Sequence, residues 1–192
     1  DRSVSRGLGD VYKRQVFTDS VDGSGEKEGV YYQYFDADLG RPVVNEGEDG
    51  LQKLDYALYK AEQEGIKLLI TFTNNWEAFG GMGQYVQWAK LAGENVSGHD
   101  DFYTNETIKG WYKDYIKTLL NHENVYTGVK YKDDPTIFSW ELANEPRCES
   151  DAGCENNTVV KWATEMSAYV KSIDDNHMLA VGCLLYTSDA AD

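Results

Sequence analysis

The chain has 192 residues, of which 41% are hydrophobic and 13% aromatic, enough to build a globular core. The 33 acidic residues outnumber the 18 basic ones, and the net charge of −15 repels phosphate backbones, which excludes nucleic acid as a partner. No apolar run approaches the ~20 residues that span a bilayer, so we expect no association with a membrane.

The two ends of the chain lack the periodicity of the sequence between them. Residues 1–15 and 183–192 resemble translated adapter sequence that recurs at the ends of metagenomic gene fragments. We therefore expect both segments to be non-native and outside the fold, and the domain to cover residues 16–182. On this interpretation the chain is an internal piece of a longer protein.

Two helices and a strand are predicted in the first part of the domain. Apolar residues at helical spacing predict a helix over 48–64. The nearly continuous apolar run 66–72 predicts a buried strand, followed by a polar, glycine-bearing loop over 74–83. Apolar residues at steps of three and four over 108–120 predict the next helix, which Thr104 is placed to cap.

The remaining elements continue the alternation. Residues 136–143 and 177–182 read as buried strands, with a helix over 157–173 between them. The order strand, helix, strand, helix, strand predicts an α/β fold of parallel βαβ units, in an open doubly wound sheet or a closed barrel. No glycine-rich phosphate loop opens any of these helices, which disfavours a nucleotide site.

The strand over 136–143 stops at the corner Asn144–Glu145–Pro146. Because Pro146 cannot donate to a ladder, it helps to end the strand and leaves Glu145 at the carboxyl rim of the sheet, where α/β folds place ligands. Glu141 shares a face with Glu145, but four residues of strand separate their α-carbons by about 13 Å, too far for a catalytic pair. We expect Glu141 to lie lower, ion-paired or hydrogen-bonded.

Four stretches carry a family resemblance, in the order 68–76, 79–81, 140–148 and 162–177. They resemble glycoside hydrolase family 5, and within it the endo-β-1,4-mannanases of the fungal, plant and related type. The resemblance implies a (β/α)8 TIM barrel, of which the chain holds about strands 2 to 5. It also implies retaining, endo-acting hydrolysis of β-1,4-mannosidic bonds in mannan, glucomannan or galactomannan.

The resemblance assigns Glu145 as the general acid/base. Such a glutamate must retain its proton near neutral pH, through low dielectric and a nearby carboxylate. The nucleophile of the family is a glutamate on strand seven, outside this sequence. We therefore expect the chain by itself to be inactive, because a retaining enzyme needs both carboxyl groups.

Further site residues follow from the same resemblance, each with a structural alternative. Asn144 binds the 2-hydroxyl of the sugar being cleaved, or only forms a turn. Trp76, with Asn75 before it, provides a platform in the substrate groove, or anchors its loop by packing. Arg147 reaches the leaving-group side of the cleft, or pairs with Glu149 or Asp151.

Cysteines and sequons bear on localisation. The spacing of Cys148 and Cys154 allows a loop-closing disulfide, and fungal-type relatives carry a similar but tighter pair, whereas Cys183 belongs to the C-terminal segment. No His or further Cys clusters with them, so we expect no metal. Glycosylation sequons begin at Asn95, Asn105 and Asn156. Together these features predict a secreted, extracellular protein.

Two other functions remain open. The chain could come from a family 5 β-1,4-glucanase of the cellulase type, because such enzymes share the Asn-Glu-Pro corner, or from a barrel that only binds polysaccharide. In each case we expect a monomer without a cofactor, with β-mannan as the partner in the favoured hypothesis.

Overall fold

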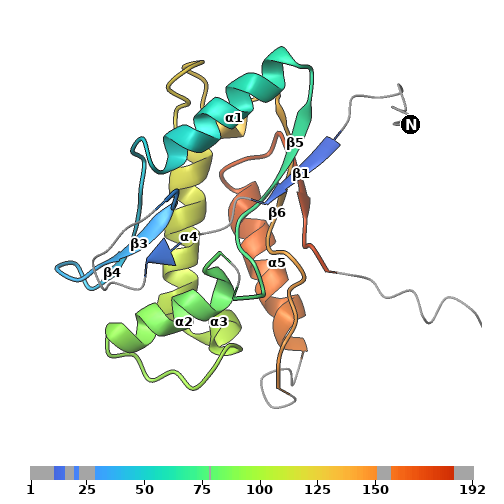
Figure 1. The fold of residues 1–192 in the computed structure, drawn as a ribbon. Coiled ribbons are helices and arrows are strands. Elements are labelled where there is room, and N and C mark those ends of the chain that lie inside the picture. The colour runs from blue at the N-terminus through green and yellow to red at the C-terminus, as the bar shows by residue number, and fades with distance from the viewer. Residues whose placement is uncertain (1–10, 16–19, 22–28, 78, 151–156, 184–192) are drawn as a thin grey trace, which may run out of the picture.

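The computed structural model describes residues 11–15, 20–21, 29–77, 79–150 and 157–183. In this part of the chain, four parallel strands form one sheet in the order β1 (Val11–Gln15), β5 (Lys67–Thr71), β6 (Ile137–Glu141) and β7 (Met178–Ala180) (Figure 1). A smaller sheet holds β2 (Ser20–Val21), β3 (Gln33–Asp36) and β4 (Arg41–Val44), with β3 and β4 antiparallel.

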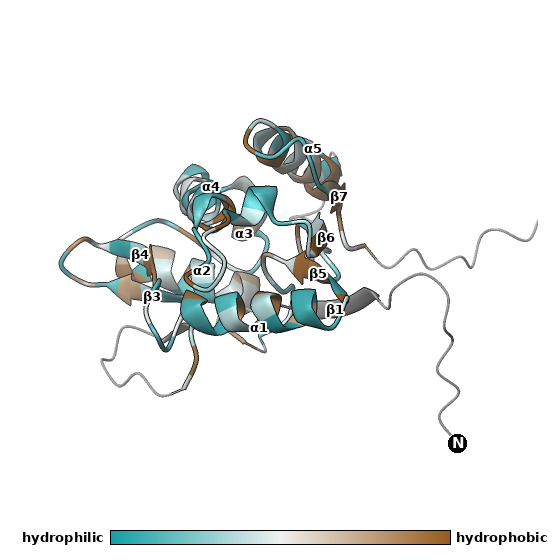
Figure 2. Cartoon of the chain, turned by 90° about the horizontal axis from the view of Figure 1, so that it is seen from above, coloured by the Kyte–Doolittle hydropathy of each residue, from teal (hydrophilic) through white to brown (hydrophobic). Residues whose placement is uncertain are grey.

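Helices connect the parallel strands and surround one side of the four-stranded sheet, as Figure 2 shows from above. Their bounds are α1 (Leu51–Gln63), α2 (Gly81–Leu91), α3 (Asp101–Thr104), α4 (Glu106–Asn121) and α5 (Thr158–Lys171), with a 3₁₀ turn η1 (Tyr131–Asp133). Because β5, β6 and β7 are adjacent and parallel, each neighbouring pair is joined by a helical crossover. The predicted α/β class is confirmed.

The strongly periodic elements lie where the sequence predicted them. The strands expected over 66–72, 136–143 and 177–182 are confirmed as β5, β6 and β7, with shorter bounds. The three predicted helices correspond to α1, α4 and α5. Helix α1 buries the apolar residues that set its period, namely Leu51, Leu54, Leu58 and Ala61.

The predicted cap of α4 is wrong by one residue. Asn105, not Thr104, is the N-cap, and its side-chain oxygen accepts a hydrogen bond from the Ile108 amide at 3.0 Å. Thr104 is instead the last residue of the short helix α3. An Asn side chain satisfies one of the free amides of the first turn as well as a Thr side chain does, so Asn105 can replace the neighbouring Thr104 as the cap.

The predicted loop over 74–83 is wrong at its end, because α2 begins at Gly81. Gly81 has φ +61°, and a Cβ there would lie 2.1 Å from the Trp76 carbonyl oxygen. The two glycines at 80 and 81 therefore make a tight turn that brings the chain back against the strand end, rather than extending the loop. Met82 completes the turn by donating its amide to the Asn74 carbonyl at 2.8 Å.

The N-terminal segment requires a third correction. We expected residues 1–15 to contribute nothing to the fold, yet Val11–Gln15 form β1 and pair in register with Lys67–Thr71 of β5. An unpaired strand edge offers a row of main-chain donors and acceptors that many sequences can satisfy, so pairing does not require a native strand sequence. The non-native origin of this segment stays a prediction.

Aromatic side chains fill much of the core between the sheet and the helices. Phe72, just past the end of β5, and Trp140 of β6 stack with ring centroids 5.2 Å apart. Trp162 of α5 packs against Phe102 and Tyr112, with centroids at 5.7 and 5.9 Å. Such large buried rings interlock in few arrangements, so they fix the helices relative to the strands that end at the candidate site.

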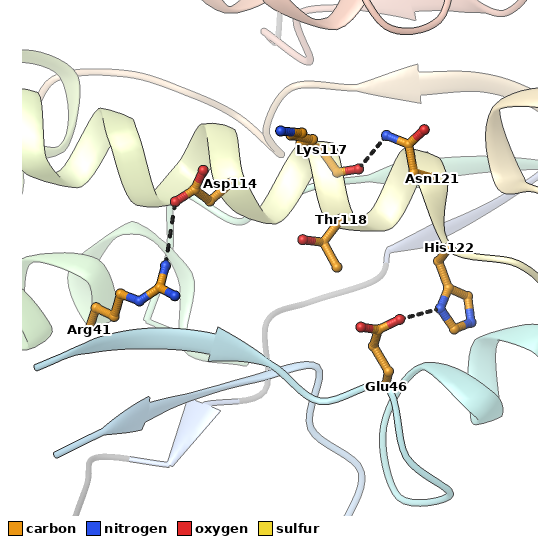
Figure 3. A pocket seen from close by; sticks show the side chains of 7 residues that line it. All are labelled: Arg41, Glu46, Asp114, Lys117, Thr118, Asn121 and His122. Atoms are coloured by element: carbon orange, nitrogen blue, oxygen red, sulfur yellow. Dashed lines mark hydrogen bonds and ion pairs between the residues drawn. The ribbon is translucent and has the colours of Figure 1, made fainter. Parts of the chain in front are cut away.

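A charge cluster joins α1 to the end of α4, with Asp55 and His122 buried and Glu46 exposed. His122 Nδ1 lies 2.9 Å from Glu46 Oε2, and His122 Nε2 lies 3.1 Å from both oxygens of Asp55, which is fully buried. Figure 3 shows the Glu46–His122 pair at one end of an open cavity of about 600 Å³ that runs along α4. Because ionised carboxylates only accept hydrogen bonds, His122 can satisfy both partners only as the imidazolium.

This cluster makes stability depend on pH. Burial works to lower the pKa of His122, but the hydrogen bonds to Asp55 and Glu46 outweigh it and hold this pKa above its ordinary value. A histidine whose pKa is raised in the folded state stabilises the fold fully at pH values below its unfolded-state pKa of about 6.5. This stabilisation is lost as the pH rises through the folded-state pKa. We therefore expect the stability difference between the wild type and His122→Gln to shrink from pH 5.5 to 9. Urea unfolding of both proteins measures it, and a pH-independent difference would contradict the prediction.

Candidate active site

The corner that carries Glu145 is fixed by main-chain hydrogen bonds to both neighbouring strands. Past the end of β6, the Asn144 amide donates to the Thr73 carbonyl at 2.9 Å and the Glu145 amide to the Gly182 carbonyl at 3.1 Å. Glu145 has φ +53°, in the left-handed region that side chains other than glycine rarely adopt. Strain of this kind persists where the surroundings impose it, and it concentrates at functional sites.

Gly182 is part of this corner. It has φ +90°, and a Cβ there would lie 1.7 Å from the Ala143 carbonyl oxygen. Only a glycine lets the chain after β7 approach β6 this closely. The Gly182 carbonyl oxygen, which accepts the hydrogen bond from the Glu145 amide, therefore depends on a glycine at this position. Any other residue there would force the backbone to shift.

Trp76 contacts Glu145 directly. Its indole Nε1–H donates to Glu145 Oε2 at 2.9 Å, between residues 69 positions apart in the chain. The side chain is 42% exposed, so it is not an anchor packed into the core. Of the two hypotheses for Trp76, the structure favours a platform beside the carboxyl group, although contact with a substrate stays a prediction.

Arg147 lies over the Trp76 ring, with its guanidinium carbon 4.2 Å from the ring centroid. In the described part of the chain Arg147 makes no ion pair with Glu149, whereas Asp151, the other expected partner, lies outside the described residues. A guanidinium stacked on an indole face gains a cation–π attraction of about 0.5–1 kcal/mol at an exposed site and restrains both side chains. Glu145, Trp76 and Arg147 therefore form one contiguous group.

The two asparagines predicted to bind substrate differ in position. Asn144 is half-buried beside Glu145, and its Nδ2 donates to Asn74 Oδ1 at 3.0 Å. Asn75 is buried, and its Oδ1 accepts hydrogen bonds from the Arg147 amide at 3.2 Å and the Tyr103 hydroxyl at 3.4 Å. Asn75 thus holds the main chain of Arg147 in place. Substrate binding by either residue stays a prediction.

Glu141 lies deeper in the sheet and is buried. The Thr71 hydroxyl of the neighbouring strand donates to Glu141 Oε1 at 3.0 Å. The hydrogen-bonded alternative expected for this carboxyl group is therefore confirmed. This contact compensates part of the cost of removing a carboxyl group from water.

Sequence patterns did not identify Asp100, which braces the segment after Arg147. Its carboxylate accepts hydrogen bonds from the Glu149 amide at 2.8 Å and from the Ser150 amide and hydroxyl at 3.0 and 2.7 Å. Burial works to raise the pKa of Asp100, but the hydrogen bonds that the carboxylate accepts outweigh it and lower this pKa. The local sequence gave no signal, because the partners lie about 50 residues away.

A family model described as GH family 5 beta-mannosidase-like matches residues 40–189. The chain belongs to this glycoside hydrolase family. The resemblance expected from the four sequence stretches is confirmed. The match runs into the segment 183–192, whose non-native origin stays a prediction.

Named relatives agree with the family match. The chain is 49% identical over 138 residues to mannan endo-1,4-beta-mannosidase 1 of Oryza sativa subsp. japonica, covering 72% of this chain and 32% of the relative. It is 52% identical over 135 residues to mannan endo-1,4-beta-mannosidase 7 of Arabidopsis thaliana, covering 70% and 31%. This family 5 chain thus spans about a third of the length of these curated relatives.

Solved structures give the same result for the fold. The endo-1,4-beta-mannanase from Rhizomucor miehei superposes with a TM-score of 0.78 at 42% identity, over 90% of this chain and 47% of that chain. An endo-beta-1,4-mannanase from Thermotoga petrophila gives 0.69 at 42% identity, over 90% and 36%. The α/β arrangement of this family 5 chain is therefore that of the matching part of these enzymes.

The remaining features concern cysteines, metals and membranes. Cys148 is disulfide-bonded, but Cys154, its expected partner, lies outside the described residues, so the pairing stays a prediction. Among the residues that the structure describes, no group of three or more His, Cys, Asp or Glu side chains could hold a metal ion. Within the same ranges, no helix of this family 5 chain is both long and apolar enough to cross a membrane.

Proposed function

We propose that this chain is the part of a retaining endo-β-1,4-mannanase that carries its general acid/base, Glu145. The observation that carries the proposal is the 2.9 Å hydrogen bond from the Trp76 indole to the Glu145 carboxyl group at the end of β6. It joins a proton-transfer group to an exposed aromatic ring that suits a sugar face. The printed names of the relatives, which are mannan endo-1,4-beta-mannosidases, support mannan as the polymer.

In this mechanism Glu145 protonates the glycosidic oxygen as the leaving sugar departs, while a carboxylate attacks the anomeric carbon from the opposite face. Glu145 then removes a proton from the water that hydrolyses the covalent intermediate. The attacking glutamate lies outside this sequence and must come within about 5 to 5.5 Å of Glu145 for the retaining reaction. Asn144, next to the acid, would hold the 2-hydroxyl of the same sugar.

We also propose the finer fold and localisation. The adjacent parallel strands β5, β6 and β7, with helices on one side, support a segment that covers about strands 2 to 5 of a (β/α)8 barrel. A disulfide at Cys148 supports secretion into an oxidising, extracellular environment. A monomeric state remains a prediction.

The choice of polymer is tested with the full-length protein that contains this sequence. We expect reducing sugars to be released from glucomannan and galactomannan roughly tenfold or more faster than from carboxymethylcellulose, because a site that hydrogen-bonds one sugar stereochemistry leaves polar groups unpaired with another. Preferential cleavage of carboxymethylcellulose would favour the glucanase alternative. Tight binding of mannan without cleavage would favour the non-catalytic alternative.

A further inference from the structure

A short stretch between α2 and α4 contacts both loops that carry the candidate catalytic group. It comprises residues 97–103, which include the first turn of α3, and we refer to it as the brace segment. On one side it reaches the loop after β5, which carries Trp76. On the other side it reaches the chain after β6, which carries Glu145 and Arg147. The brace segment therefore connects two parts of the site that are about 70 residues apart in the sequence.

Tyr103 makes the first connection from a buried position. Its hydroxyl donates to the Arg147 carbonyl at 3.0 Å and lies 3.4 Å from Asn75 Oδ1, the atom that also accepts the Arg147 amide. Burial is the largest of the causes that raise the pKa of Tyr103. The hydroxyl therefore stays protonated and remains a donor, and it ties the main chain of Arg147 to the residue before Trp76.

Asp100 and His99 make the second connection. His99 Nε2 lies 3.0 Å from the Asn75 carbonyl oxygen, and His99 Nδ1 lies 3.1 Å from Asp100 Oδ1. The Asp100 carboxylate also accepts the amides of Glu149 and Ser150 at 2.8 and 3.0 Å. Because a carbonyl oxygen and a carboxylate only accept hydrogen bonds, His99 satisfies both partners as the imidazolium. The loop after β5 and the chain after β6 are thus joined by two sets of contacts.

The brace segment is itself fixed to the rest of the domain. The Asp101 carboxylate accepts the Ser97 amide at 2.5 Å, the Ser97 hydroxyl at 3.0 Å and the Gly98 amide at 2.9 Å. The Tyr103 ring packs edge-on against Trp162 of α5, with centroids 5.3 Å apart. A segment held in this way can impose its geometry on the loops that it contacts.

The two loops meet at the acid. The Trp76 indole donates to Glu145 Oε2 at 2.9 Å, and Arg147 lies over the Trp76 ring. One hydrogen bond and one cation–π contact between exposed side chains are too weak to hold two loops in a single arrangement. Proton transfer requires a donor–acceptor distance of about 2.6–3.2 Å, and a displacement of about 1 Å can lower the rate by 10²-fold.

We infer that Tyr103 and Asp100 are positioning residues for proton transfer by Glu145, because they hold the loop of Trp76 against the chain that carries the acid. They act through the main chain of the two loops rather than on the substrate. The inference rests on the proposed function, since it concerns the acid step of that reaction. Loss of the two residues should therefore impair only those reactions in which the leaving group needs a proton.

The test varies the leaving group. With the full-length protein, kcat/KM is measured for phenyl and dinitrophenyl glycosides of the same mannooligosaccharide; phenolate needs a proton to leave, whereas dinitrophenolate does not. The double variant Asp100→Ala/Tyr103→Phe is expected to lower kcat/KM by about ten- to hundredfold for the phenyl glycoside and by less than about twofold for the dinitrophenyl glycoside. A variant with only a damaged fold would lose activity equally with both.

The matched control is Asp36→Ala/Tyr131→Phe, which should leave both values of kcat/KM unchanged. Asp36 accepts the Leu39 amide at 2.9 Å in the turn between β3 and β4. Tyr131 is buried before β6 begins, and its hydroxyl donates to Asp55 at 2.5 Å. The control therefore removes the same two kinds of group at a distance from the strand end that carries the acid.

A thermal melt shows whether each variant is folded at the assay temperature. If the double variant is not, Tyr103→Phe alone, which removes a single oxygen, is expected to give a selective loss of about three- to tenfold. An equal loss with both glycosides, or no loss, would overturn the inference. Glu145→Gln in the same assay identifies a failure of the proposed function, because it would then show no selective loss. A selective loss for Glu145→Gln alone would refute only the positioning role.

Discussion

Replacing Glu145 by glutamine is expected to lower kcat of the full-length enzyme on mannan by about 10²- to 10⁴-fold, the usual contribution of a general acid. An amide has nearly the same shape as the carboxyl group but cannot supply a proton to the leaving oxygen. Its oxygen can still accept the hydrogen bond from the Trp76 indole. The Glu145→Gln variant should therefore keep its fold and its affinity for mannooligosaccharides, and lose turnover.

Two controls separate this result from general damage. Glu123→Gln makes the same chemical change at an exposed position and should keep normal activity. With a dinitrophenyl glycoside, whose leaving group needs no proton, the Glu145→Gln variant should form the glycosyl-enzyme, and added azide should speed its turnover by replacing water. A variant with normal kcat on mannan would remove the assignment of Glu145.

Replacing Asp55 by alanine is expected to destabilise the chain by about 3–5 kcal/mol, the usual cost of breaking a buried ion pair. Asp55 is fully buried on α1, and its carboxylate accepts hydrogen bonds from the Tyr131 hydroxyl at 2.5 Å and the Val125 amide at 3.3 Å. It also faces the His122 ring. The change would remove the nearest acceptor of the buried Tyr131 hydroxyl and leave the His122 ring with Glu46 as its remaining carboxylate partner.

Urea unfolding measures this loss, with Asp114→Ala as the matched control. Asp114 pairs with Arg41 at 3.8 Å on the surface, where both side chains are at least half exposed. An exposed pair of this kind contributes about 0–1 kcal/mol, so the control should stay close to the wild type. Similar losses for both variants would mean that the Asp55 cluster does not stabilise the fold as its burial indicates.

The sequence predicted the elements whose pattern is local. Continuous apolar runs identified β5 and β6, and steps of three and four identified α4, because the period of an element follows from its own backbone geometry. It failed for α2, whose glycines and polar residues read as a loop. That helix forms because Tyr85 is buried against Phe102 of α3 and Tyr112 of α4, and Trp88 is buried beside Tyr85. The sequence of the segment does not reveal this stabilisation.

Sequence patterns also did not predict how the N-terminal strands pair. Residues 11–15 have no strand periodicity that distinguishes them, yet they complete the edge of β5. The hairpin of β3 and β4 was likewise not predicted, because strands of four residues carry too few positions to establish a period. Both elements depend on main-chain partners rather than on their own side chains.

The sequence by itself determined the family and the strand end that carries Glu145, because a strand that stops at Asn144–Glu145–Pro146 is encoded in consecutive residues. Only the tertiary structure decided what surrounds the acid. The Trp76 indole reaches Glu145 from 69 residues away, and Asp100 holds the amide of Glu149 from 49 residues away. Such contacts depend on the register between parallel strands and on the course of the loops that follow them. Neither the register nor the loop course can be predicted from the sequence around either contacting residue.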